Sequence, residues 1–201
     1  MKKLLLLLII PLLCFIGCNK EDDDLTNIPN TQDYLLCESI FNDVGRIVED
    51  ACNSEIKRSN PATECATYTL SNDTLIIDFG PTNCLGLYGK YRRGKIIIVY
   101  TGAYRDSSSV ITTTFDEYYV NDNLVQGFRI VTNQGINNQG NMWFTVEINN
   151  ASITLANNNG TISWNSNRTR EWIEGYSSML NPFDDKYLIS GSVTGNGVSG
   201  N

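Results

Sequence analysis

The chain has 201 residues, a formal net charge of −7 at pH 7 and no histidine. Its length fits one domain, or one domain with a small appendage. An acidic chain is a poor match for nucleic acid, whose binding depends on Lys and Arg at the phosphates, so no nucleic-acid partner is expected. The lack of histidine excludes Ser-His-Asp and Cys-His catalysis and any His-ligated metal site.

Residues 1–17 have the pattern of a secretory signal peptide. Lys2 and Lys3 are followed by an apolar run, which is shorter than the roughly 20 residues that a spanning helix needs. Gly17 before Cys18 resembles a bacterial lipobox. This resemblance predicts cleavage before Cys18 and a lipid on its sulfur. The alternative is an ordinary secreted protein in which Cys18 is incidental.

Residues 18–31 are expected to form the lipidated cysteine and an acidic tether. Lys20, Glu21 and the aspartates that follow resemble the signal behind the lipidated cysteine of surface-exposed Bacteroidota lipoproteins. The resemblance implies an outer-membrane protein that faces the cell exterior, with the membrane as partner through the lipid anchor. The alternative is a charged leash without a signal, because like charges repel and stay extended.

An amphipathic helix is predicted over residues 32–53, because apolar residues recur in steps of three and four. The apolar face consists of Leu36, Ile40, Val44, Ile47 and Ala51. The opposite face is acidic, with Asp33, Asp43, Glu49 and Asp50. We expect this helix to pack on a sheet.

The hydrophobic period changes to two beyond the helix, which predicts an antiparallel β domain over residues 65–201. Short connectors rich in Asn and Gly favour pairing of consecutive strands, a meander. The expected fold is mainly β: an antiparallel meander forming a sandwich or a half-open roll, with the helix as its cover. The sequence stops in what looks like a strand and its turn, so it is either a fragment or has a shortened C-terminal sheet.

Four cysteines lie in the body, and an even number in an exported protein suggests disulfides, with three possible pairings. Cys65 and Cys84 flank a predicted hairpin and form the favoured bridge. Cys37 and Cys52 lie about 22 Å apart along the predicted helix. Bonded cysteines need Cα atoms within about 7 Å, so these two stay free thiols unless the helix breaks at Gly45.

One resemblance extends over roughly residues 65–191. The segments that carry it are Ile77-Asp78-Phe79-Gly80, Asn83-Cys84, Arg93-Gly94-Lys95-Ile96-Ile97-Ile98, Tyr118-Tyr119-Val120-Asn121 and Arg168-Thr169-Arg170-Glu171-Trp172. In order and spacing they resemble a family of uncharacterised β-rich Bacteroidota lipoproteins. The resemblance implies export and a β-rich body, and it brings no activity with it.

The best candidate for ligand binding is a set on one predicted strand, namely Trp164, Arg168, Arg170 and Trp172. Side-chain alternation puts all four on one face. Indole rings stack on sugars and guanidinium groups pair with carboxylate or sulfate, so an exposed stripe of this kind could bind an anionic glycan. The alternative is structural: each arginine packs over an aromatic ring or pairs with Glu171 or Glu174.

A basic cluster surrounds Gly94, with Lys90, Arg92, Arg93 and Lys95. It could face lipid headgroups or the acidic tether. The alternative is a solvated beginning of a strand.

Other motifs are less specific. Glycoside hydrolysis needs two carboxyl groups about 5–9 Å apart, and the candidate acids are Asp116-Glu117, Glu171 with Glu174, and Asp184-Asp185. Asp116 and Glu117 are expected to point to opposite faces, so a catalytic pair would have to assemble across strands. The Asn121-Asp122-Asn123 turn and the pair Asp184-Asp185 carry oxygens for calcium but too few ligands for a loop motif. Asp73-Thr74-Leu75 resembles the O-glycosylation acceptor of Bacteroidota, with a turn-to-strand role for Thr74 as the alternative.

Taken together, the sequence predicts a non-enzymatic binding or interaction module of the cell envelope, with no cofactor and no metal. The expected partner is a glycan or a protein. The alternatives are a periplasm-facing structural lipoprotein that supports an envelope complex and, more remotely, a glycoside hydrolase.

Overall fold

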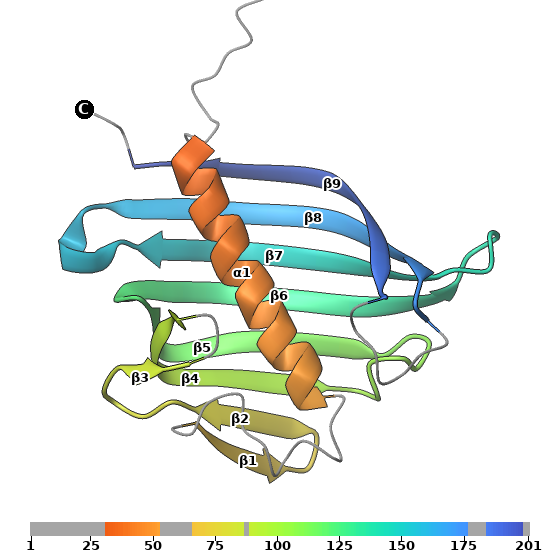
Figure 1. Ribbon diagram of the computed structural model, residues 1–201, viewed down its shortest axis with the longest axis horizontal. Coiled ribbons are helices and arrows are strands. Elements are labelled where there is room, and N and C mark those ends of the chain that lie inside the picture. Colours follow the sequence, from red (N-terminus) through yellow and green to blue (C-terminus); the bar gives the residue numbers. More distant parts are fainter. Residues whose placement is uncertain (1–30, 53–65, 87–88, 177–183, 199–201) are drawn as a thin grey trace, which may run out of the picture.

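The computed structural model describes residues 31–52, 66–86, 89–176 and 184–198. One helix crosses one face of a single nine-stranded antiparallel sheet (Figure 1). This confirms the expected antiparallel β-rich fold with one helix. The described strands all belong to one open sheet, so they do not form the two layers of a sandwich.

The strands follow one another across the sheet in chain order, β1-β2-β4-β5-β6-β7-β8-β9, and the short β3 pairs with β4. Their bounds are β1 Thr67–Ser71, β2 Thr74–Asp78, β3 Cys84–Leu85, β4 Tyr91–Tyr100, β5 Val110–Val120, β6 Asn123–Ile136, β7 Met142–Thr154, β8 Thr161–Glu174 and β9 Lys186–Asn196. This is the predicted meander, because each short connection leads directly to the neighbouring strand.

The tight turn between β5 and β6 shows how the connectors work. Asn121 and Asp122 both have positive φ angles, of 48° and 64°. A two-residue hairpin turn of this hand matches the twist of the flanking strands, and Asn and Asp tolerate it better than most residues. The turn therefore forms from its own backbone chemistry, and no calcium ion is needed to explain it.

A β-bulge in β5 changes which side chains face the helix. The pairing with β4 shifts between Arg93 and Lys95, and Glu117 is the extra residue, with a φ of 45°. As a result, Asp116 and Glu117 are both exposed, while Tyr118 is buried. Gly94 lies opposite the bulge, where a Cβ would stand 1.9 Å from the Glu117 carbonyl oxygen.

Helix α1 spans Thr31–Cys52 and crosses the sheet diagonally, from β9 to the strands around β4 (Figure 1). Its length agrees with the prediction, and Gly45 does not interrupt it. The buried apolar stripe is rotated from the predicted one and consists of Cys37, Ile40, Phe41, Val44 and Val48. The predicted Leu36, Ile47 and Ala51 are only partly buried.

The acidic face of α1 is a correction to the sequence analysis. Asp33 and Asp43, predicted to lie in solvent, are 8% and 1% exposed. Asp43 pairs with Arg92 of β4, and Asp33 accepts a hydrogen bond from the Val198 N–H, just after β9. Aromatic contacts complete the packing, with Tyr34 against Trp164 and Phe41 against Phe115 at centroid distances of 5.2 and 6.2 Å.

Candidate functional site

Four acidic side chains of α1 make polar contacts with the rest of the chain beneath the helix. They are Asp33, Glu38, Asp43 and Glu49. A buried ion is costly unless it is paired, so each contact fixes the helix on the sheet at a particular position.

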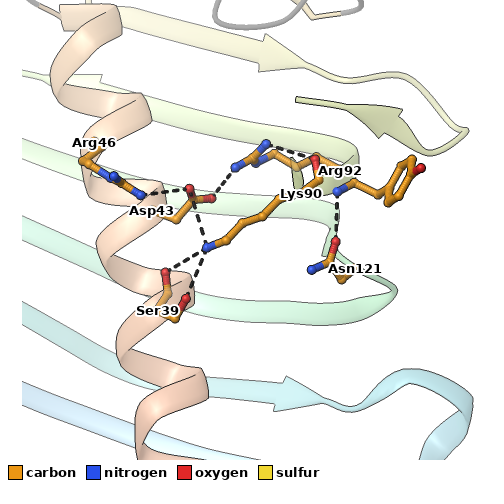
Figure 2. A network of polar contacts seen from close by, with 7 residues as sticks. Ser39, Asp43, Arg46, Lys90, Arg92 and Asn121 are labelled. Atoms are coloured by element: carbon orange, nitrogen blue, oxygen red, sulfur yellow. Dashed lines mark hydrogen bonds and ion pairs between the residues drawn. The ribbon is translucent and has the colours of Figure 1, made fainter. Parts of the chain in front are cut away.

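The Asp43 centre joins α1 to β4 (Figure 2). Asp43 Oδ2 lies 2.6 Å from Arg92 Nη2, and both side chains are 2% exposed. Lys90 Nζ lies 3.7 Å from Asp43 Oδ1 and donates to both oxygens of Ser39 at 3.3 Å. Arg46, at 3.5 Å, closes the exposed side. Burial lowers the pKa of Lys90, and nearby Asp43 opposes that shift.

The Glu49 centre joins α1 to β6 and β8. Arg170 donates to both carboxylate oxygens of Glu49, at 2.6 and 3.2 Å, and to the Tyr104 hydroxyl at 2.7 Å. Arg129 Nη2 lies 3.8 Å from the same carboxylate. Burial alone would lower the pKa of Arg170, but Glu49, Tyr104 and Tyr187 together outweigh burial and raise it. In Arg129 burial dominates and lowers the pKa. The guanidinium groups of Arg129 and Arg170 therefore both pair with Glu49 of the helix.

Glu38 makes the third contact. Its carboxylate accepts a hydrogen bond from Arg168 of β8, which also donates to the Tyr34 hydroxyl at 3.0 Å. The side chains of Arg168 and Glu38 are 24% and 19% exposed, so this pair lies nearer to solvent than the Asp43 centre.

These contacts show where the four residues predicted to bind a ligand lie. Trp164, Arg168, Arg170 and Trp172 share one face of β8, as expected, but that face lies under α1. The two indoles are 0% and 4% exposed, and the two arginines pair with Glu38 and Glu49. They do not form the exposed stripe on which the glycan interpretation depended. The structural alternative describes them, with the helix acids in place of Glu171 and Glu174.

The basic cluster around Gly94 is divided between the two faces of the sheet. Arg92 is buried against Asp43, which corrects the expectation of a solvated cluster. Arg93 instead pairs with Asp122 and stacks over Tyr119, and Lys95 lies 3.2 Å from Asp116. The cluster therefore presents no continuous basic surface to lipid headgroups or to the tether.

The cysteines separate into two kinds. Cys37 and Cys52 are free thiols on an unbroken helix, and burial raises their pKa values to about 12 and about 11. Cys84 is disulfide-bonded. Its predicted partner Cys65 lies outside the described residues, so that pairing stays a prediction.

The face of the sheet opposite α1 carries a polar arrangement around Glu171 that is not apparent from the sequence. Glu171 Oε1 accepts hydrogen bonds of 2.7 Å from the side-chain amides of Asn137 and Asn141. The bonds from Asn141 and Asn137 lower the pKa of Glu171. Trp143 of β7 is the register partner of Glu171 and is partly buried. We call these four residues the Glu171 platform.

The platform continues into a band of hydroxyl groups. Thr132, Thr145, Thr169 and Ser190 are register partners in succession on β6, β7, β8 and β9. Register partners stand side by side on one face of a sheet, and alternation along the strands puts this row on the face of Trp143 and Glu171. No described element covers this face (Figure 1).

The remaining candidates add no site. Thr74 begins β2 and is partly buried. Nowhere in the described ranges do three or more His, Cys, Asp or Glu side chains gather in a group that could hold a metal ion. The signal peptide, Cys18 and the tether lie outside the described residues, and none of the described helices could cross a membrane.

Comparison with known proteins identifies no relative: no family model matches the chain, and neither a curated protein nor a solved structure does. The resemblance to Bacteroidota lipoproteins therefore stays a prediction. What the fold defines is a single antiparallel sheet whose one covering helix is held by ion pairs.

Sequence reasoning missed the helix-to-sheet ion pairs and the Glu171 platform. One signal for the ion pairs was present: Arg129 stands between Phe128 and Ile130 in an apolar strand, and a charge in such a place needs a buried partner. The platform had no comparable signal, because Asn137, Asn141 and Glu171 meet only when β6, β7 and β8 are paired.

Proposed function

We propose that the protein is an exported lipoprotein of the outer membrane, anchored through Cys18 and facing the cell exterior, whose sheet is a non-enzymatic module that binds a glycan. The signal-peptide pattern, Gly17-Cys18 and the acidic tether support the anchor and its orientation. The observation that carries the binding proposal is the Glu171 platform on the uncovered face.

The chemistry of the platform suits sugar hydroxyls. The lowered pKa keeps Glu171 ionised, and an ionised carboxylate is a strong acceptor of hydrogen bonds. Both amides bond to Oε1, so within the described part of the chain Oε2 has no donor and is open to a ligand. The indole of Trp143 supplies the apolar surface against which a sugar ring packs.

Charge favours a neutral glycan over the anionic one that the arginines had suggested. Arg168 and Arg170 are occupied under the helix. The platform carries a carboxylate, and the whole chain has a net charge of −7. An acidic sugar would meet repulsion here, whereas neighbouring hydroxyls can donate to Glu171 and bond with Thr145 and Thr169.

The same geometry favours binding over hydrolysis. Glycoside hydrolysis needs a second carboxyl group about 5–9 Å from the first. Glu147 is on the same strand as Trp143 but four residues away, which is about 13 Å along β7. This spacing is too long for a catalytic pair with Glu171. Glu174, at the end of β8, is already paired with Lys186 at 2.5 Å.

Binding is tested with the full chain on a panel of neutral and acidic glycans. We expect Trp143→Ala and Glu171→Gln to weaken binding to a neutral glycan at least tenfold. Glu147→Gln is the matched control, because it removes a carboxylate from another row of the same face. Equal binding by all four proteins, or binding to acidic glycans alone, would contradict the proposal.

Location is tested by protease treatment of intact cells, with a periplasmic protein as control. Digestion of the sheet domain while the control survives is expected. Survival until the outer membrane is opened would favour the periplasm-facing structural lipoprotein instead. Cys18→Ser should release the chain from the membrane fraction if the lipid is its anchor.

A further inference from the structure

Strand β9 forms one edge of the sheet and is long for such a position. It pairs with β8 along its whole length, Lys186–Asn196, and no described strand pairs with its other side. Leu188 and Ile189 are 58% and 55% exposed on its two faces. Native proteins protect edge strands with charge, proline, bulges or a covering segment. From Tyr187 to Asn196 the sequence holds no charged residue and no proline.

The other edge differs. Strand β1 has only five residues, Thr67–Ser71, and its neighbour in the sheet is equally short. Short edge strands offer few backbone groups to an incoming chain. The two edges are therefore unequal, and β9 is the one suited to accept another strand.

Residues 197 and 198, which follow β9, lead toward α1. The Val198 N–H donates to Asp33 Oδ2 in the first turn of α1, at 2.9 Å. Val198 also packs over Gly160, in the connection between β7 and β8. The last described residues therefore contact the helix and the β8 side, and none of the described strands pairs with the other side of β9.

We propose that β9 pairs in antiparallel register with β9 of a second copy, which joins the two sheets into one. A two-fold axis at Gly191 places Ser190 opposite the partner's Ser192 and Ile189 opposite the partner's Val193. Alternation puts Ile189 and Val193 on the helix-covered face and Ser190 and Ser192 on the open face. Apolar residues thus meet apolar ones and serines meet serines, so the strand is self-complementary, as a two-fold interface requires.

The pairing also covers apolar surface. Ile189 is the register partner of Arg170 on β8 and has no described strand on its other side. In the paired form it would lie between Arg170 and the partner's Val193. Cross-strand contacts of aliphatic side chains stabilise sheets, and the new ladder would satisfy backbone groups that otherwise face water.

The test introduces like charges across the proposed β9–β9 interface, in the full chain solubilised in a mild detergent. Sedimentation velocity is expected to show a dimer that dissociates on dilution. Ser190→Lys combined with Ser192→Lys places lysines directly opposite one another and should raise the dissociation constant about tenfold or more. Thr67→Lys with Thr69→Lys, on the exposed β1 edge, is the matched control and should change nothing.

The register of the β9–β9 pairing is tested by mixing two oppositely charged variants. A chain with Ser190→Glu and Ser192→Glu should also fail to self-associate, but an equimolar mixture with the double-lysine chain should restore the dimer. Hydrogen exchange of β9 amides should slow with rising protein concentration.

Three results would overturn the proposal. The first is a folded monomer at every concentration that stays in solution. The second is slow β9 exchange in that monomer, which would mean that another part of the same chain covers the edge. The third is a dimer that is sensitive to the β1 control and insensitive to the β9 variants.

Discussion

Asp43 of α1 and Arg92 of β4 form an ion pair in which both side chains are 2% exposed, with 2.6 Å between Oδ2 and Nη2. The two residues are 49 positions apart in the chain. The pair fixes the helix against the sheet at one point, and Glu49 with Arg170 fixes it at a second. Together the two pairs set the diagonal course of α1.

The first prediction concerns this pair. Asp43→Leu should lower the free energy of unfolding by about 3 kcal/mol, because it leaves Arg92 buried without its carboxylate. Combining Asp43→Leu with Arg92→Met should recover part of that loss. Arg46→Ala is the control and should cost less than about 1 kcal/mol, because its side chain is 54% exposed. Urea unfolding measures all four proteins, and equal losses for Asp43→Leu and Arg46→Ala would contradict this account.

The second prediction concerns Gly94, which has a φ of +80° and lies against Glu117. Gly94→Ala should destabilise the fold by about 3 kcal/mol or more, because the positive φ and a backbone clash both oppose a Cβ. Gly80 has nearly the same φ, +78°, but nothing lies within 4 Å of its Cβ position. Gly80→Ala should therefore cost only about 1 kcal/mol. Similar losses at both positions in thermal unfolding would show that the bulge does not need a glycine.

The third prediction concerns Gly45, which lies in the middle of α1 over the guanidinium group of Arg129. In an exposed helix, replacing Gly by Ala stabilises by about 1 kcal/mol. Here a Cβ would stand 3.0 Å from Arg129 Nη2, and Arg129 is only 5% exposed. Because the buried guanidinium has little room to move, Gly45→Ala should give no gain or a loss. A full gain of about 1 kcal/mol in urea unfolding would mean that Arg129 yields easily.

The fourth prediction concerns pH. Burial raises the pKa of the Cys37 thiol from 9.0 to about 12. The folded state therefore holds a proton that the unfolded chain releases, so this stabilisation is complete below pH 9 and is lost as the pH rises toward 12. Cys37→Ala should flatten the fall in unfolding free energy between pH 9 and 11. Cys52 and Tyr187, raised to about 11 and about 12, should leave a residual slope.

Thiol labelling at neutral pH tests the difference in burial between Cys37 and Cys52. Cys37 is fully buried and Cys52 is partly exposed, so Cys52 should react first with a thiol reagent. In a Cys52→Ser chain, Cys37 should then label only as fast as the protein opens. Rapid labelling of Cys37 in that folded variant would show that α1 is not held on the sheet as described.

Much of the fold could be predicted from the sequence because its signals are local. A helical period of 3.6 placed the helix within one residue of Thr31–Cys52, and alternation with Asn-rich turns gave the antiparallel meander. The bulge at Glu117 could not be predicted, because it depends on how β4 and β5 pair. The face of the helix was misplaced for a similar reason: Asp33 and Asp43 look like solvent residues until Val198, just after β9, and Arg92 of β4 supply their partners.

The candidate site was likewise predictable only where the signal is local. The sequence alone determined that Trp164, Arg168, Arg170 and Trp172 share a face, since alternation is a property of any strand. Only the tertiary structure decided that this face lies under α1 and that the open face carries Glu171 with Asn137 and Asn141. A side chain's neighbours along a strand follow from chain geometry, whereas its neighbours across strands and beneath a helix follow from which surfaces lose water on folding.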